Sequence, residues 1–273
     1  MYNKMYQACL PDDFWDMKLY DCHMNNHLDA YSILARGFWC CENKPKEGKL
    51  LLTGINPSYN NRTLDKPTTP FADLKGGFWE KKKKQFGELW NDDTMSYLDL
   101  FPIRESDQRH FEQSFDNNEH VRSIRGNILK VTQDAIEEMK PLLIVHANKD
   151  SLYYWGIKKN TPAGDDANDY EHPWMGYKVK RVTLETYPDL PPCMLEYDRL
   201  SLFPLYEIVG FVDSDKRINH IERQETNLKF IMEYVIDDRN PKYNGKLYQQ
   251  NKEKKDWEEI WKWVQDHYAE SHK

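Results

Sequence analysis

Short apolar runs that end in glycine or polar residues recur along the chain, and longer amphipathic segments separate them. The runs occupy residues 49–56, 94–102, 142–147 and 205–213. Runs of this length are typical of strands buried on both faces, whereas segments 118–139 and 221–237 have the apolar spacing of helices. Strands that alternate with helices pair in parallel. The sequence therefore predicts an α/β fold, a three-layer α/β/α sandwich with a mostly parallel central sheet of four to five strands.

The remaining segments add helices around this core. We expect helices over residues 27–40 and 77–90, a short helix over 148–156 and an edge strand over 177–185. Residues 1–240 then form one domain with an N-terminal helical extension. Residues 241–273 form a helical tail in which Trp257, Trp261 and Trp263 share roughly one face. That face favours docking on the domain, and a partner-binding helix is the less favoured alternative.

Composition limits the classes of partner. The 273 residues include 38 Lys and Arg against 45 Asp and Glu, for a net charge of -7. This balance excludes a surface that is strongly basic throughout and binds nucleic acid, but it does not exclude a local basic groove. No apolar run reaches the roughly 18 residues that a membrane helix needs, and the N-terminus lacks the apolar region of a secretory signal. We therefore expect a cytoplasmic protein without a membrane partner.

The cysteines do not form a familiar metal-ligand pattern. They number five, no CxxC occurs, and they stand at Cys9, Cys22, Cys40, Cys41 and Cys193. Reduced thiols are the favoured interpretation, over a structural zinc or an iron–sulfur cluster. We accordingly expect no metal and no cofactor.

Ligands of open parallel sheets bind beyond the carboxyl ends of the strands. The most distinctive segment at such a position runs from Gly54 to Ser58. Gly54 lets the backbone approach a ligand closely, and Pro57 stiffens the turn. The carboxamide of Asn56 is neutral at any pH and can hold a water or read the edge of a base. The alternative is a tight turn in which Asn56 caps the backbone. Other strand-end candidates for substrate contacts are Asp99, His146 and Asn148, and the alternatives are a surface or capping Asp99 and a satisfied buried His146.

A second distinctive segment follows, with Pro70-Phe71-Ala72 and, five residues later, Phe78-Trp79. Phe71 is expected on a loop, where its ring could stack on a planar ligand or plug the core. Phe78 and Trp79 begin a helix and are expected to anchor it.

Together, GINPS, PFA and FW resemble the mismatch-specific branch of the uracil-DNA glycosylase superfamily, over residues 50–79. The resemblance implies an enzyme that flips a damaged or mismatched base out of DNA and hydrolyses its N-glycosidic bond. It implies that Asn56 positions the hydrolytic water, that Phe71 stacks on the base, and that Gly54, Ile55, Pro57 and Ser58 line the pocket. The enzyme is expected to act on DNA as a monomer.

The chain departs from that family in three places. Ser58 stands where that branch has a glycine. Asp99 stands close to the sequence position at which some branches have an asparagine that reads uracil, and an ionised Asp99 only accepts hydrogen bonds. The family's last motif, NPSG or HPS, does not follow residues 205–213. Phosphate contacts could instead come from Lys81, Lys82, Lys216, Arg217 and His220, which are equally compatible with solvated turns and helix faces.

Two further functions stay open. A glycosylase scaffold that has lost catalysis could bind nucleic acid or a nucleotide, and the absence of the last motif favours this alternative. Hydrolysis of a free nucleoside or nucleotide would need the crevice without the contacts to DNA.

Overall fold

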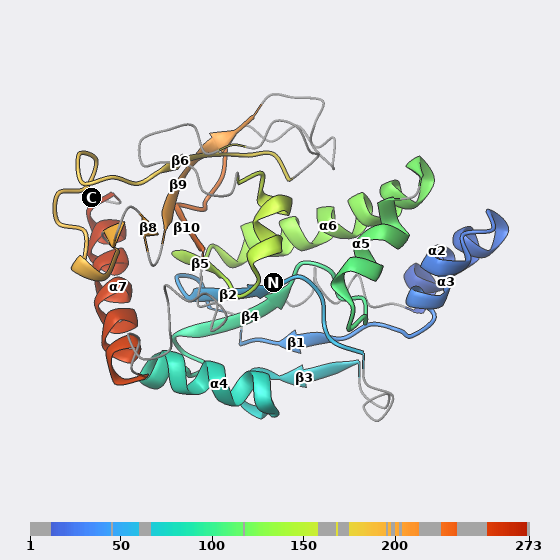
Figure 1. The fold of residues 1–273 in the computed structure, drawn as a ribbon, viewed down its shortest axis with the longest axis horizontal. Helices are drawn as coiled ribbons and strands as arrows, with labels where there is room; N and C mark the ends of the chain where they lie inside the picture. The colour runs from blue at the N-terminus through green and yellow to red at the C-terminus, as the bar shows by residue number, and fades with distance from the viewer. Residues whose placement is uncertain are drawn as a thin grey trace.

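The computed structural model describes residues 12–44, 46–59, 67–116, 118–157, 168, 175–194, 196–197, 200–201, 204–212, 225–233 and 250–271. The protein is an α/β structure in which helix α7 and the α2–α3 pair lie at opposite ends of a central sheet (Figure 1). The helices are α2 (Asp12–Met24), α3 (Leu28–Leu34), α4 (Gly77–Phe86), α5 (Gln108–Asp116), α6 (Glu119–Met139) and α7 (Gln250–Ser271). In the part of the chain that is described, none of these helices is long and apolar enough to cross a membrane.

The central sheet has six strands in the order β4-β2-β5-β10-β9-β6. The strands are β2 (Leu50–Gly54), β4 (Met95–Asp99), β5 (Leu143–His146), β6 (Tyr177–Arg181), β9 (Leu205–Phe211) and β10 (Phe230–Glu233). β4, β2, β5 and β10 pair in parallel, whereas β9 is antiparallel to both of its neighbours. The sheet is therefore mixed and mostly parallel, with one strand more than the upper number expected. The expected edge strand is confirmed as β6.

Smaller elements connect the main ones. β1 (Cys40–Glu42) pairs in parallel with β3 (Thr68–Pro70), and β7 (Glu196–Tyr197) pairs with β8 (Leu200–Ser201). Four 3-10 helices are described: η1 (Phe71–Asp73), η2 (Gly87–Leu89), η3 (Lys149–Trp155) and η4 (Pro192–Met194). The sequence predicted η3 as a short helix, and Gly156 ends it in the left-handed conformation (φ 69°).

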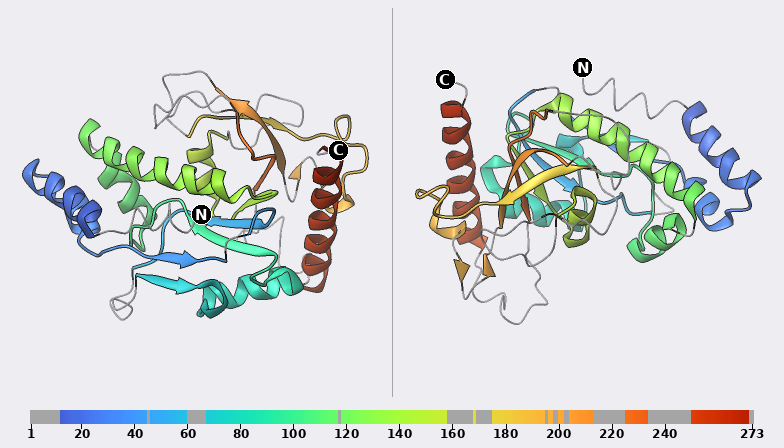
Figure 2. Two further views of the ribbon diagram at one scale, coloured as in Figure 1. Left: turned by 180° about the vertical axis from the view of Figure 1, so that it is seen from behind. Right: turned by 90° about the horizontal axis from the view of Figure 1, so that it is seen from above.

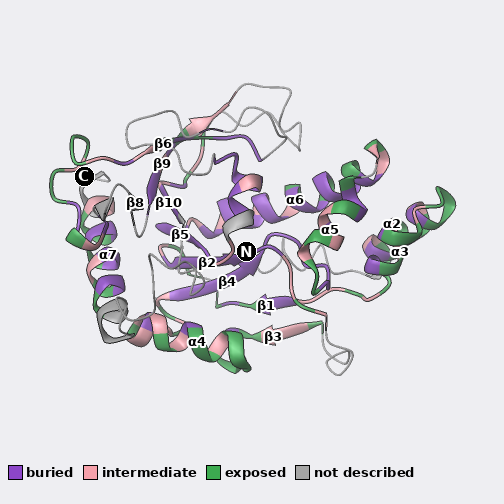
Figure 3. Ribbon diagram, in the orientation of Figure 1, coloured by how far each residue is buried: buried purple, intermediate pink, exposed green. Residues whose placement is uncertain are grey.

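Burial is concentrated in the strands of the central sheet (Figure 3). Alternate residues of β2, β4, β5, β9 and β10 enter two separate apolar clusters, because successive side chains of a strand point to opposite faces. Leu51, Ile144 and Ile231 pack with α6, α5 and α3. Leu50, Leu143 and their alternating neighbours pack with α4 and α7. Helices therefore cover both faces of the sheet, as Figure 2 shows from above.

The long helix α6 forms where the sequence predicts it. Asn118 caps its start, since the side chain accepts a hydrogen bond from the Val121 amide at 3.0 Å. Lys140 ends it in the left-handed conformation (φ 47°), and Pro141 follows. The boundaries of this element are thus set by local sequence signals.

The structure corrects the secondary structure predicted for residues 221–237. The sequence predicts an amphipathic helix there, but residues 230–233 form β10 between β5 and β9. Phe230, Ile231 and Met232 are all buried, so both faces of this strand contact the core. A short, continuously apolar segment fits such a strand as well as it fits a helix. The residues on either side of 225–233 lie outside the described part.

The C-terminal segment forms the expected helix, α7, which packs on the domain. Trp257, Trp261 and Trp263 are all buried in the cluster that includes α4. The ring centroids of Phe86, on α4, and Trp257 lie 4.6 Å apart.

Candidate functional site

The carboxyl ends of three neighbouring strands bring the sequence-predicted residues to one edge of the sheet. In the register of the parallel strands, Gly54 lies opposite Asp99 and Thr53 lies opposite His146. Asn56 and Asn148 follow these strand ends within two residues. The structure thus gathers Gly54, Asp99, His146 and the residues after them around the end of β2.

A tyrosine–aspartate pair occupies the space beside Gly54. Tyr97 donates a hydrogen bond from its hydroxyl to Asp99 Oδ1 at 2.7 Å, and both side chains are buried. A Cβ on Gly54 would lie closer than 3.0 Å to each of these oxygen atoms. Two side chains of β4 thus occupy the space that the sequence analysis assigned to a ligand beside Gly54.

Burial changes the chemistry of Asp99. Desolvation raises the pKa of this carboxyl to about 7, although the hydrogen bond from Tyr97 acts in the opposite direction. Near neutral pH a substantial fraction of Asp99 is therefore protonated. A protonated carboxyl can donate a hydrogen bond as well as accept one, which the ionised form cannot.

Asn56 is held in one orientation by the neighbouring loop. Its Nδ2 group donates to the carbonyl oxygen of Glu105 at 2.6 Å and lies 3.3 Å from that of Ile103 and 3.4 Å from that of Pro57. All three neighbours are acceptors, so the side facing them must be the NH2 group. Its Oδ1 atom is buried and has no hydrogen-bond partner among the described residues. The carboxamide thus presents one unsatisfied acceptor in a defined direction.

The loop that holds Asn56 is itself anchored by the side chain of Glu105. This carboxylate pairs with Arg36, accepts a hydrogen bond from the Ser106 amide at 2.7 Å and lies 2.9 Å from His110 Nδ1. Burial alone would raise the pKa of Glu105, but hydrogen bonds from the Asp107 amide, His110 and Arg36 outweigh it and lower that pKa. Glu105 therefore stays ionised and fixes the backbone that orients Asn56.

The sequence left His146 as either a substrate contact or a buried core histidine, and its partners were not predicted. Its Nδ1 atom lies 2.8 Å from Thr53 Oγ1 and 2.8 Å from Ser151 Oγ, while its Nε2 atom is buried and no described residue forms a hydrogen bond with it. Complete burial lowers the pKa of His146 to about 3, so the imidazole is neutral. It links β2, β5 and η3 from within the core, on the sheet face covered by α6.

Phe71 lies in the core. The side chain is 2% exposed and belongs to the cluster on the α4 and α7 face, and η1, not a loop, carries it. Its ring stacks on Trp90, with centroids 4.9 Å apart and an interplanar angle of 24°. One face of the ring is therefore occupied by the protein, and the core alternative describes this residue.

The other predicted pocket residues have diverse environments. Ile55 is fully buried, Pro57 and Asn148 are half-buried, and Ser58 is exposed. The Pro57 carbonyl accepts a hydrogen bond from the Glu105 amide at 3.0 Å, and the Asn148 carbonyl accepts one from Ser151 Oγ at 2.6 Å. Both loops are thus tied to neighbouring segments through their backbones.

The residues predicted to contact phosphates differ in their exposure to solvent. Lys81 is exposed on α4, but Lys82 is buried at 7% exposure, with its ammonium 5.5 Å from the centroid of the Phe78 ring. The expectation that Lys82 presents charge to solvent is therefore wrong. Lys216, Arg217 and His220 lie outside the described residues. They follow β9 in the chain, which is the antiparallel strand of the sheet.

Among the described residues, the single group of three side chains able to ligate a metal lies elsewhere, at Cys193, Asp256 and Glu259. Searches of family models, curated proteins and solved structures find no match to this chain.

Proposed function

We propose that this protein is a DNA glycosylase-like enzyme that hydrolyses the N-glycosidic bond of a flipped, damaged or mismatched base of the uracil type. The observation that carries the proposal is the Asn56 carboxamide. Its NH2 group is held by backbone carbonyls, and within the part of the chain that the structure describes its Oδ1 atom has no hydrogen-bond partner. An acceptor in this position can orient a water molecule for attack at the sugar carbon.

The fold supports the same proposal. Strands β4, β2, β5 and β10 form a four-stranded parallel core, as the resemblance to the glycosylase superfamily implies. With helices on both faces, the arrangement is that of a three-layer α/β/α sandwich. GINPS stands at the end of the first strand of this core, where open α/β sheets bind ligands.

Asn56 needs no basic strength in this mechanism. Bond cleavage passes through an oxocarbenium-like sugar and an anionic leaving base, so placement of dipoles contributes more than proton abstraction. The Oδ1 atom would accept a hydrogen bond from the water and aim its oxygen. Backbone amides near residues 55–58 would stabilise the charge that develops on the base.

Phe71 has no part in this proposal, because its side chain is buried in the core. The Pro-Ser of the family's last motif is absent after β9, and the segment after β10 contains Asn240-Pro241 followed by Lys242. That segment lies outside the described residues, and mutation of Asn240 would test its part in DNA binding.

A single-turnover assay tests the proposal. Duplexes with uracil or thymine opposite guanine, and a matched duplex with cytosine, are incubated with excess protein, and abasic sites are revealed by alkaline cleavage. Release of uracil or thymine but not of cytosine is expected.

The absence of the family's last motif favours one alternative, a scaffold that binds nucleic acid without releasing a base. Measurable binding to the same duplexes, with no abasic sites on any of them, would support that alternative and exclude the glycosylase.

A further inference from the structure

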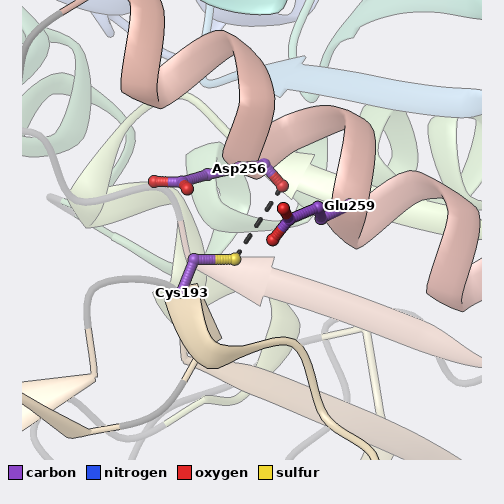
Figure 4. A group of neighbouring side chains, drawn as sticks. All are labelled: Cys193, Asp256 and Glu259. Carbon is purple, nitrogen blue, oxygen red and sulfur yellow. Dashed lines mark hydrogen bonds between the residues drawn. The ribbon is translucent and has the colours of Figure 1, made fainter.

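A thiol and two carboxyl groups meet where the C-terminal helix contacts the η4 turn. Cys193 comes from η4, and Asp256 and Glu259 come from α7 (Figure 4). One ligand atom of each side chain lies within 4.8 Å of the other two. Residues more than 60 positions apart in the chain thus bring three potential metal ligands together.

Local structure accounts for this convergence. Asp256 and Glu259 are three residues apart on a helix, so their side chains lie on the same face. The thiol of Cys193 donates a hydrogen bond to the backbone carbonyl of Asp256, with 3.8 Å between sulfur and oxygen. The sulfur is therefore already held against α7.

The three groups differ in their access to solvent. Asp256 is 5% exposed, Cys193 is half-buried, and the Glu259 side chain is 42% exposed. An ion could thus enter from the side of Glu259. Lys255 lies 3.6 Å from Glu259 Oε1, but its side chain is 74% exposed and can turn into solvent.

We propose that Cys193, Asp256 and Glu259 bind one zinc ion that joins the η4 turn to the C-terminal helix. Tetrahedral zinc holds sulfur at about 2.3 Å and carboxylate oxygen at about 2.0–2.2 Å, with donor atoms roughly 3.5 Å apart. Side-chain rotations that shorten the present separations by about 1 Å would complete such a site. A water molecule would take the fourth position, and the Cys193 thiol would release its proton to solvent.

The mixture of donors selects the metal. Magnesium and calcium prefer sites made only of oxygen, and copper(I) prefers sites made only of soft sulfur donors. Zinc accepts thiolate and carboxylate together. The proposal is independent of the glycosylase activity, since this site lies on α7 and not at the strand ends.

The test uses the full chain, stripped of metal and freed of any histidine tag. Zinc is titrated by calorimetry, and cobalt(II) is added as a spectroscopic probe of thiolate ligation. One zinc per chain and a sulfur-to-cobalt charge-transfer band are expected. Cys193→Ser should abolish the band, and Glu259→Gln should weaken zinc binding at least about 10-fold. The exposed neighbour Glu258 provides the matched control, and Glu258→Gln should bind like the wild type.

Circular dichroism confirms that each variant is folded before titration. Stoichiometric binding that depends on Cys193 and Glu259, but not on Glu258, would establish the site. Absence of zinc binding by the folded wild-type protein would overturn the proposal. A charge-transfer band that persists in Cys193→Ser would overturn it as well, because the thiolate would then come from another cysteine.

Discussion

Replacement of Gly54 by alanine tests how the end of β2 is constructed. The added Cβ would lie closer than 3.0 Å to Asp99 Oδ1 and to the Tyr97 hydroxyl, and both side chains are buried. Overpacking a core costs about 1–3 kcal/mol. Displacing a buried hydrogen bond so that its donor or acceptor is left unsatisfied costs about 1–3 kcal/mol. We therefore expect Gly54→Ala to lower the free energy of unfolding by about 3–5 kcal/mol.

Urea denaturation at pH 7, followed by tryptophan fluorescence, measures this change. Gly77→Ala is the matched control, because no heavy atom lies within 4 Å of its added Cβ, and it should change stability by no more than about 1 kcal/mol. In a Tyr97→Phe background one of the two clashes is absent, so Gly54→Ala should cost less there. A loss below about 1 kcal/mol in the wild-type background, or an equal loss in both backgrounds, would refute the reasoning.

Three buried groups predict how stability depends on pH, each measured by urea denaturation across a pH series. The pKa of Asp99 is raised from 3.8 to about 7. Ionisation of Asp99 therefore lowers the free energy of unfolding by about 4 kcal/mol as pH rises from about 4 to 7, and Asp99→Asn should remove this loss. The pKa of His146 is lowered from 6.5 to about 3, so stability should fall as pH drops below about 6.5, and His146→Gln should reduce that slope. The pKa of Glu105 is lowered, so the stabilisation of the fold by the ionised carboxylate is present above about pH 4.3 and is lost as pH falls through the pKa of the folded state. Glu105→Gln should therefore lose less stability on acidification than the wild type. An unchanged slope in any of these variants would contradict the role given to that group.

Much of the fold follows from local sequence signals. β2, β4 and β5 are short apolar segments bounded by turn residues, and α6 has a capping asparagine and a terminal proline. These signals act within a few residues, so the sequence predicts them well. β10 was predicted as a helix because a four-residue apolar segment does not distinguish the two structures, and its position between β5 and β9 decides between them.

In the candidate site, too, some features follow from local sequence signals and others depend on tertiary packing. The position of Asn56 after β2 was predicted, but the carbonyl groups that orient it belong to a loop about 50 residues away. The partner of Phe71 is Trp90, and the partners of His146 are Thr53 and Ser151. Contacts of this kind depend on tertiary packing, and no local pattern encodes them. The same reason explains why Cys193, which has no cysteine or histidine close by in the chain, did not indicate a metal site.

The central claim concerns the Oδ1 atom of Asn56, and the rate of base release in Asn56→Ala tests it most directly. Single-turnover rates on a duplex with uracil opposite guanine are compared for the wild type, Asn56→Ala and the matched control Asn127→Ala, which changes an exposed residue of α6. The wild type and Asn127→Ala should release uracil at similar rates, whereas Asn56→Ala should be slower by about 10²–10³-fold, with its fold intact. Release of uracil by Asn56→Ala at the wild-type rate, or no release by the wild type, would contradict the account.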